Sequence, residues 1–184
     1  MKRFYLVRHG RAQAGFGESM DPALDAAGRA QAETVAQMLA PLGPLPILSS
    51  PLRRAQETAA PLARLWNATP IIEHAVAEIP SPKGMTLEER VGWLRKLMAG
   101  SWRDVPRKLA EWRETCVATA AALPCDCVIF SHFIAINVLA GAATHDDRVV
   151  VFSPDNCSVT VFETDGTSLR LIEKGEEASL TKVN

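Results

Sequence analysis

The sequence lacks the charge excess that marks proteins binding nucleic acids or anionic membranes. Its 184 residues carry a formal net charge of −1, with 20 Lys and Arg against 21 Asp and Glu. Neither half is strongly basic, so no whole-protein field attracts a polyanion. We therefore expect any anion site to be local, built from a few arginines and backbone amides, with no nucleic acid and no membrane among the partners.

Cysteine is scarce, and its spacing matches no standard motif. Of four cysteines, Cys125 and Cys127 are separated by one residue, which fits neither a redox CxxC pair nor a zinc knuckle. Only a short apolar run follows Met1-Lys2-Arg3, so we expect no signal peptide. No apolar stretch approaches the roughly 20 residues that span a bilayer. These features predict a cytoplasmic protein with reduced thiols.

The chain also lacks internal repeats, low-complexity segments and any linker long enough to divide domains. Its hydrophobic content is 47%, and its length suffices for a sizeable core, since single domains commonly hold about 100–200 residues. We therefore predict a single domain over residues 1–184.

Short apolar runs alternate with helical patterns along the chain. Strands are predicted at residues 4–7, 47–48, 70–73 and 126–130, the first of the buried type, with a terminal hairpin at 158–163 and 169–173. Helices are predicted at residues 27–42, 53–66, 86–98, 105–123 and 133–143. Thr86 and Glu89 form a capping box, and residues 11–26 a loop. This alternation predicts an α/β fold, a three-layer α/β/α sandwich with a mostly parallel central sheet.

Three polar groups follow directly after predicted strands. In open parallel sheets, ligands bind beyond the carboxyl ends of the strands. Segments far apart in the sequence are therefore expected to meet in one crevice. These segments are residues 8–10, 50–54 and 131–132.

Arg8-His9-Gly10 combines a candidate nucleophile with an anion-binding side chain. A neutral imidazole is a competent nucleophile near neutral pH, because the ordinary pKa of histidine is about 6.5. Arg8 offers a planar fork of donors for phosphate oxygens, and Gly10 lets the backbone pass close to a ligand. Taken alone, the three residues fit a surface turn equally well.

The other groups add anion-binding features. Arg53 and Arg54 open a predicted helix, whose N-terminus attracts anions; one of the two arginines is expected to be solvated. His132 starts another helix, where it would donate to a phosphate oxygen or cap the helix locally. A carboxyl group near such a site would be driven toward its protonated form and would protonate a leaving alcohol. Glu78 is the candidate, and Glu73 is the alternative.

Together the motifs resemble those of the histidine phosphatase, or phosphoglycerate mutase-like, superfamily over nearly the whole chain. Arg54 falls in the family's arginine position and Arg53 in the variable one. A single RHG would be a weak signal, whereas four matches in order are specific. These matches are LVRHG at 6–10, LDAAGRAQA at 24–32, SSPLRRAQET at 49–58 and VIFSH at 128–132.

The resemblance implies a phosphomonoester hydrolase that acts on a small phosphorylated metabolite through a phosphohistidine intermediate. Glu78 would protonate the leaving oxygen and then activate water. The implied reaction relies on positioning and charge stabilisation, with no cofactor and no metal. The implied catalytic residues are His9, Glu78 and His132, and the implied phosphate-binding residues are Arg8, Gly10, Arg54, His132 and Phe133.

Several departures from the family pattern bear on the substrate. Phe133 stands where the superfamily typically has glycine, so its ring would narrow the pocket or stack on a substrate. The loop after Gly10 lacks the asparagine typical of the mutase branch. An insert at residues 81–103 is a candidate helical cap over the pocket, with packing of Trp93 on the core as the equal alternative. Asn156, before the terminal hairpin, is a candidate for indirect contact with the site.

Three other functions would use the same residues. A phosphoglycerate-type mutase is disfavoured by the short chain and the altered first loop. A phosphoprotein phosphatase would need an open, uncapped site. A non-catalytic phosphate-binding module is favoured by Phe133 and opposed by the joint presence of a nucleophile and an acid.

Zinc at His9 and His132 is disfavoured because two nearby arginines would repel a cation. An apolar strip on the terminal hairpin is a candidate homodimer contact.

Overall fold

The computed structural model describes residues 1–13 and 21–179, and its strands and helices alternate as predicted. The strands are β1 Lys2–Arg8, β2 Ile47–Ser49, β3 Ile71–Ile72, β4 Cys127–Ser131, β5 Val159–Thr164 and β6 Leu169–Glu173. The α-helices are α1 Ala26–Leu39, α2 Arg53–Trp66, α3 Leu87–Met98, α4 Arg107–Ala121 and α5 Phe133–Thr144. Short 3-10 turns are η1 Ala40–Leu42, η2 His74–Val76 and η3 Trp102–Asp104.

The six strands form one sheet with a parallel centre and an antiparallel edge. Their order is β3-β2-β4-β1-β5-β6. β4 pairs in parallel with β1 and with β2, and β2 pairs in parallel with β3. β5 pairs antiparallel with β1 and β6, the latter across the predicted terminal hairpin. The prediction of a mostly parallel sheet is therefore confirmed.

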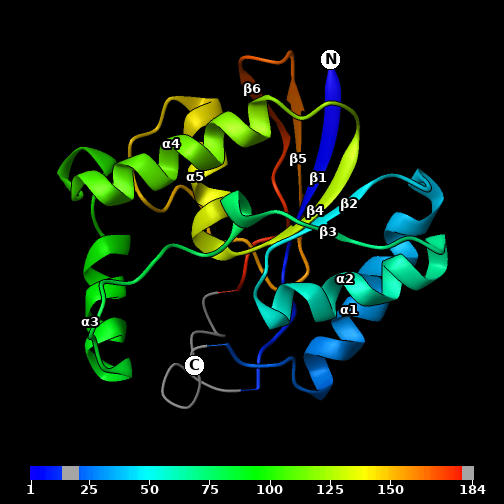
Figure 1. Cartoon of the computed structure of the whole chain (residues 1–184), viewed down its shortest axis with the longest axis horizontal. Coiled ribbons are helices and arrows are strands. Elements are labelled where there is room, and N and C mark those ends of the chain that lie inside the picture. Colours follow the sequence, from blue (N-terminus) through cyan, green and yellow to red (C-terminus); the bar gives the residue numbers. More distant parts are fainter. Residues whose placement is uncertain (14–20, 180–184) are drawn as a thin grey trace.

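Helices cover both faces of the sheet, which confirms the three-layer sandwich. Figure 1 shows α1 and α2 together on one side and α4 and α5 on the other. Alternate strand residues serve the two faces. Val128 and Phe130 of β4 pack with α1 and α2, whereas Cys127 and Ile129 pack with α4 and α5. All five residues of β4 are buried, because the strand has neighbours on both edges and helices on both faces.

Several predicted elements are longer than the observed ones. The helix predicted at 105–123 starts after Pro106, which takes the N-cap position. The helix predicted at 27–42 becomes a 3-10 turn in its last three residues, where Pro41 cannot donate the hydrogen bond that an α-helix needs. The strand predicted at 70–73 keeps only two paired residues. Boundary errors of this kind leave the topology unchanged.

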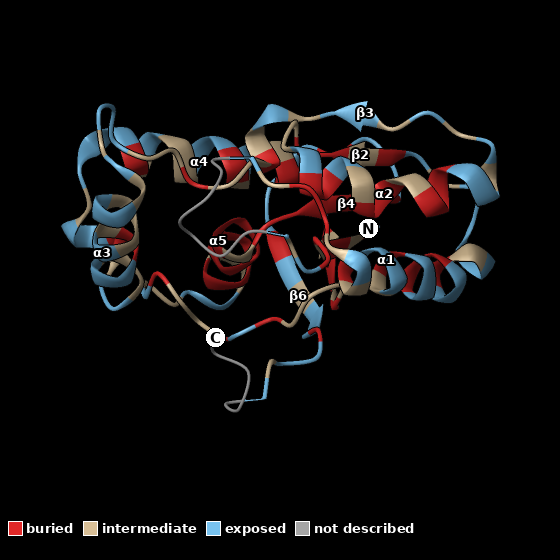
Figure 2. Ribbon diagram, turned by 90° about the horizontal axis from the view of Figure 1, so that it is seen from below, coloured by how far each residue is buried: buried red, intermediate tan, exposed pale blue. Residues whose placement is uncertain are grey.

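Helix α3 is the element farthest from the sheet in Figures 1 and 2. The predicted capping box is confirmed: Thr86 Oγ1 accepts from the Glu89 amide at 3.2 Å, and Glu89 accepts from the Thr86 amide at 2.8 Å. Leu94 is buried, and Trp93 packs against the core formed with α4 and α5. Within residues 1–13 and 21–179, no helix has the length and apolar character needed to cross a membrane.

The loop after β1 is packed closely on the start of α1. Asp25 caps this helix by accepting from the Gly28 amide at 2.7 Å. A Cβ at Gly28 would lie 2.0 Å from the carbonyl oxygen of Arg11, a contact that only glycine avoids. Of the loop predicted at 11–26, residues 14–20 lie outside the described part of the chain.

Replacing Gly28 with alanine is expected to destabilise the protein by about 1–3 kcal/mol, because the new methyl group meets backbone that must shift. Urea unfolding followed by circular dichroism measures this loss. Gly92→Ala in α3 is the matched control, since a Cβ there meets nothing within 4 Å, and it should stabilise the helix by up to about 1 kcal/mol. Equal urea midpoints for Gly28→Ala and the wild type would contradict the close approach of Gly28 to the Arg11 carbonyl.

Candidate active site

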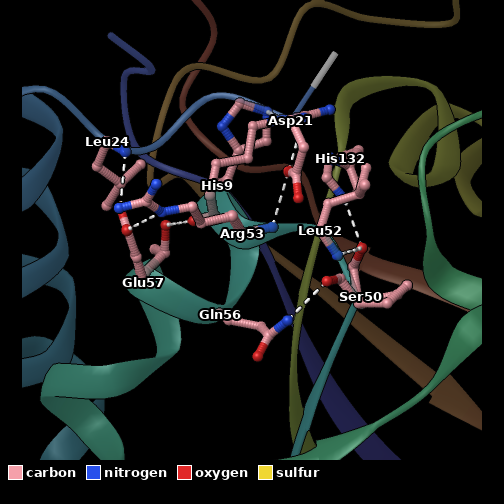
Figure 3. Close-up of polar contacts among 12 residues, drawn as sticks. His9, Asp21, Leu24, Ser50, Leu52, Arg53, Gln56, Glu57 and His132 are labelled. Carbon is pink, nitrogen blue, oxygen red and sulfur yellow. Dashed lines mark hydrogen bonds and ion pairs between the residues drawn. The ribbon is translucent and has the colours of Figure 1, made fainter. Parts of the chain in front are cut away.

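The carboxyl ends of β1, β2 and β4 lie side by side. This arrangement confirms the prediction that the polar segments following these strands meet. The strand register pairs Arg8 with Ser131 and Ser49 with Phe130. Just beyond β1, the His9 amide donates to the Ser131 carbonyl at 3.0 Å. The segments at residues 8–10, 49–50 and 131–132 therefore meet at one edge of the sheet (Figure 3).

His9 anchors one ring nitrogen and presents the other to the site. Nδ1 donates to the Gly10 carbonyl at 2.7 Å, so Nε2 is the acceptor nitrogen of a neutral ring. Arg54 Nε donates to this Nε2 at 3.2 Å. Burial, then the charges of Arg54 and Arg8, lower the pKa of His9 to about 3. At neutral pH, the Nε2 lone pair therefore faces a guanidinium group.

His132 lies beside His9, with the ring centroids 5.2 Å apart. It is fully buried and takes the N-cap position of α5. Its Nε2 is hydrogen-bonded to Ser50 Oγ at 2.7 Å, and the same oxygen accepts from the Leu52 amide at 3.2 Å. Burial, followed by the positive charges around it, lowers the pKa of His132 well below its ordinary value. The site therefore holds two neutral imidazoles at physiological pH.

Arg8 and Phe133 pack against each other. The guanidinium carbon of Arg8 lies 5.2 Å from the centre of the Phe133 ring, a cation–π contact. Arg8 Nη1 donates to the Pro154 carbonyl at 2.8 Å. Burial lowers the pKa of Arg8, while the charges of Glu78 and Asp155 raise it. The aromatic residue at the family's glycine position thus contacts a candidate phosphate ligand.

The two arginines at the start of α2 have different environments. Arg54 is 9% exposed and turns toward His9, whereas Arg53 is exposed and pairs with Glu57 at 2.7 Å. The prediction that one of the two is solvated is confirmed. Asp21 accepts from the Arg53 amide at 2.8 Å, as Figure 3 shows, and lies 3.9 Å from Arg54 Nη1. A carboxylate thus occupies the anion-attracting N-terminus of α2.

Glu78 is the carboxyl group whose charge interacts with Arg8 and Arg54. Burial raises the pKa of Glu78, and the next residue's amide and the two arginines oppose that shift. The amide of Ile79 donates to Glu78 Oε1 at 3.1 Å. Glu73, the alternative acid, caps η2 by accepting from a backbone amide at 2.9 Å. The geometry therefore favours Glu78 over Glu73.

Gly10 is held by the protein on two sides. Its amide donates to Thr58 Oγ1 at 3.0 Å, and Thr58 Oγ1 donates to the Arg54 carbonyl at 2.6 Å. A Cβ at Gly10 would lie 2.6 Å from the carbonyl oxygen of Gly28. The close backbone approach at Gly10 is therefore to the start of α1, and phosphate binding by Gly10 stays a prediction.

Three residues at the site carried no role in the sequence reasoning. Thr58 lies four residues after Arg54 on one face of α2, and this spacing is the signal that predicts their contact. Arg90 of α3 lowers the pKa of Arg54 through its charge, after the larger effect of burial, and donates to Ser81 Oγ. No pattern in the sequence marks Asp21 or Arg90, because the tertiary fold brings a loop residue and a residue of α3 to the start of α2.

Two hollows lie at the start of α2, close in sequence to Arg54. They have volumes of about 320 and 330 Å³ and share Arg53, Glu57 and Ala60 in their linings. His9 and His132 line neither hollow. In the described part of the chain, no group of three or more His, Cys, Asp or Glu residues has an arrangement suited to a metal ion.

Comparison with known proteins identifies the family. The family model described as histidine phosphatase superfamily (branch 1) matches residues 4–176. A mycobacterial glucosyl-3-phosphoglycerate phosphatase is similar in structure, with 20% sequence identity and a TM-score of 0.71, covering 97% of this chain and 100% of that one. A phosphoserine phosphatase of Entamoeba histolytica, solved with 3-phosphoglyceric acid, has 23% identity and a TM-score of 0.74, covering 96% of this chain and 98% of that one.

No curated protein matches this chain at a significant level. The family match extends over all four motifs that carry the resemblance, from LVRHG to VIFSH. The chain therefore belongs to the histidine phosphatase superfamily (branch 1).

Proposed function

We propose that this protein is a phosphomonoester hydrolase that forms a phosphohistidine at His9 and acts on a small phosphorylated metabolite. One observation carries the proposal. The Nε2 atom of neutral His9 lies at the sheet edge, 3.2 Å from Arg54 Nε, with Nδ1 fixed by the Gly10 carbonyl. A substrate phosphoryl group between this nitrogen and the arginine would meet a nucleophile and a charge-stabilising donor at once.

In the first step, the Nε2 lone pair of His9 attacks phosphorus and the bond from phosphorus to the ester oxygen breaks. Arg8 and Arg54 stabilise the negative charge on the phosphoryl oxygens, and His132 binds the same group. The carboxyl group of Glu78 transfers its proton to the leaving oxygen, so an alcohol departs. Burial of Glu78 supports this role, because it keeps a proton on the carboxyl group to a higher pH.

In the second step, the Glu78 carboxylate takes a proton from water as the water oxygen attacks phosphorus. The phosphorus–nitrogen bond breaks, and its electron pair returns to Nε2 of His9. Inorganic phosphate leaves, and Glu78 is again protonated. Each group thus returns to its starting state after one turnover.

The positive charge for this chemistry would come from Arg8 and Arg54, so we expect no cofactor and no metal. Phe133 supports a working site, because its ring packs on Arg8 and holds that side chain. Phe133, the residue that favoured a non-catalytic module, therefore has a structural role that is compatible with turnover. A mutase and a phosphoprotein phosphatase gain no specific support from the geometry.

The substrate class is proposed from the similar structures and from α3. The two similar enzymes are named for glucosyl-3-phosphoglycerate and phosphoserine, both phosphate esters of small molecules. The charge of Arg90 in α3 acts on Arg54, which supports residues 81–103 as a cap within a single domain. Trp93 packs on the core, as the alternative to a cap predicted, so the cap stays a proposal.

We also propose a cytoplasmic location, since all four cysteines are free, with a homodimer as the candidate assembly. Ile172 on β6 is 40% exposed and lies on the hairpin strip that the sequence marked as a contact. Size-exclusion chromatography with light scattering tests the assembly.

The experiment that tests the function is turnover of phosphate monoesters in the presence of a chelator. Aryl phosphate and a panel of small metabolite phosphates serve as substrates, and phosphate release is measured. In parallel, rapid quenching and mass spectrometry detect one phosphoryl group on the peptide containing His9. Turnover that vanishes with the chelator, or a phosphoryl group on another residue, would refute the proposal.

Replacing Glu78 with glutamine is expected to lower kcat by about 100-fold for alkyl phosphates, because the amide cannot protonate the leaving oxygen. The raised pKa of Glu78 predicts that wild-type activity persists as pH rises past the ordinary range of a carboxyl group and falls as pH passes through the raised pKa. His9, with a pKa of about 3, stays neutral throughout.

The alkaline fall should therefore be missing from the kcat profile of Glu78→Gln. An aryl phosphate is the matched substrate control, since its leaving group needs less protonation and should lose less activity. Substrate ionisation affects both enzymes equally and cancels in the comparison. An unchanged alkaline limb in Glu78→Gln would assign the acid role to another group.

A further inference from the structure

The two peptide groups on either side of His9 are each hydrogen-bonded at both edges. In the Arg8–His9 peptide, the carbonyl accepts from the Cys157 amide at 3.0 Å and the N–H donates to the Ser131 carbonyl at 3.0 Å. In the His9–Gly10 peptide, the carbonyl accepts from Asn156 Nδ2 at 2.9 Å and the N–H donates to Thr58 Oγ1 at 3.0 Å. The backbone of the nucleophile is therefore fixed in orientation on both sides.

Two consecutive residues after β4 and α5 supply one bond to each of these peptides. Cys157 has φ 58°, in the left-handed region that non-glycine residues rarely adopt. This turn sends the Cys157 amide to the Arg8 carbonyl and the Asn156 side chain to the next carbonyl along the chain. Such strain persists where the surrounding contacts determine the conformation, and it occurs often at functional sites.

The His9–Gly10 peptide matters for the chemistry because it positions Gly10, whose carbonyl contacts the His9 ring. The Gly10 carbonyl accepts from His9 Nδ1 at 2.7 Å and so selects the tautomer that leaves Nε2 unprotonated. Rotation of the His9–Gly10 peptide would move the residue that carries this carbonyl. Asn156 and Thr58 oppose that rotation from opposite edges of the same peptide.

We propose that Asn156 is a positioning residue for the nucleophile: by holding the His9–Gly10 peptide together with Thr58, it keeps the Gly10 carbonyl on Nδ1 and directs Nε2 at the substrate. This inference rests on the proposed phosphohistidine chemistry for its catalytic consequence. Its structural content, a fixed tautomer, does not depend on turnover. The contact predicted between Asn156 and the site is thereby given a function.

The test compares Asn156→Ala with the wild type by two readouts. Nitrogen-15 NMR of labelled histidines reports the tautomer of His9, which we expect to be mainly the Nδ1–H form in the wild type and a mixture in the variant. Rapid-quench measurement of phosphohistidine formation should show a rate about 10–100-fold lower, the usual effect of losing an orienting partner. Affinity for inorganic phosphate should change less than about threefold, because Arg8 and Arg54 remain.

Asn67→Ala is the matched control, since Asn67 is exposed, has φ 49°, and caps the C-terminal end of α2, at the opposite end from Arg54. It should lower stability without altering the His9 tautomer. Thr58→Ser should keep the hydrogen bond from the Gly10 amide, whereas Thr58→Val removes it and should reproduce the effects of Asn156→Ala. Retained phosphate binding would show that each variant is folded.

The outcomes separate the two proposals. A wild-type His9 tautomer and phosphorylation rate in Asn156→Ala would overturn the positioning role while leaving the enzyme function intact. A second outcome is that the wild type never forms phosphohistidine, while Asn156→Ala gives a mixture of His9 tautomers. That result would refute the proposed function and support the holding of the His9–Gly10 peptide by Asn156. If His9 is entirely in the Nδ1–H form in both the wild type and Asn156→Ala, the positioning role of Asn156 is refuted, whatever the activity of the two proteins.

Discussion

Removing the imidazole of His9 by substitution with alanine is expected to lower kcat/KM by about 10⁴-fold or more, because Nε2 of His9 is the neutral nitrogen to which Arg54 donates. Wild-type activity should resist a chelator, since Arg8 and Arg54 supply the positive charge. Initial rates with an aryl phosphate, with and without chelator, measure both effects. The variant should also show no phosphorylated peptide after rapid quenching.

His74→Ala is the matched control for this loss. His74 is exposed in η2, and its replacement should leave kcat/KM within about twofold of the wild type. The phosphate-binding side chains remain in His9→Ala, so inorganic phosphate should still protect it from thermal unfolding. Activity in His9→Ala above a tenth of the wild-type value would exclude His9 as the nucleophile.

Arg54→Ala is the second large effect, an expected loss of about 10³-fold in kcat/KM. Arg54 is 9% exposed and donates to Nε2 of His9, so its charge lies in a site where water screens little. Arginines that stabilise a transferring phosphoryl group commonly contribute a factor of about 10³–10⁵. Both kcat and the affinity for inorganic phosphate should fall, which steady-state kinetics and calorimetry measure.

The neighbouring residue offers the control. Arg53 has the same charge and the same helix turn, but it is exposed and pairs with Glu57. Arg53→Ala should therefore stay within about threefold of the wild type, because exposed ion pairs contribute little. Arg54→Lys should recover only part of the lost activity, since a lysine lacks the planar fork of donors. Similar losses in Arg53→Ala and Arg54→Ala would show that the site attracts phosphate by net charge alone.

The sequence predicts the layers of this fold because they depend on local patterns. The alternation along β4 that sends Val128 to one face and Ile129 to the other follows from strand geometry and is readable from the residues. The meeting of Arg8 with Ser131 also follows, since parallel strands end at a common edge. Helix ends at prolines were harder, because one residue decides where the hydrogen bonds stop.

The finer geometry of the site depends on contacts that no local pattern encodes. The ring of Phe133 has several directions open to it, and only the position of Arg8 across the sheet edge selects one. Asp21 reaches the start of α2 from a loop, and Arg90 reaches Arg54 from the insert. Gly10 illustrates the same limit, because its small size allows the close approach of Gly28 in α1, eighteen residues later.

The position of β1 in the sheet has a consequence for how the protein is made. The strand that carries Arg8 is synthesised before both of its partners, which are β4, Cys127–Ser131, and β5, Val159–Thr164. The turn that holds the two peptides around His9 is also synthesised after β4. β1 therefore stays unpaired until the chain has grown past β4, and folding is governed by contacts of long sequence separation, which form slowly. The hydrogen bonds that fix the backbone of His9 should form only after residues 127–157 have been synthesised.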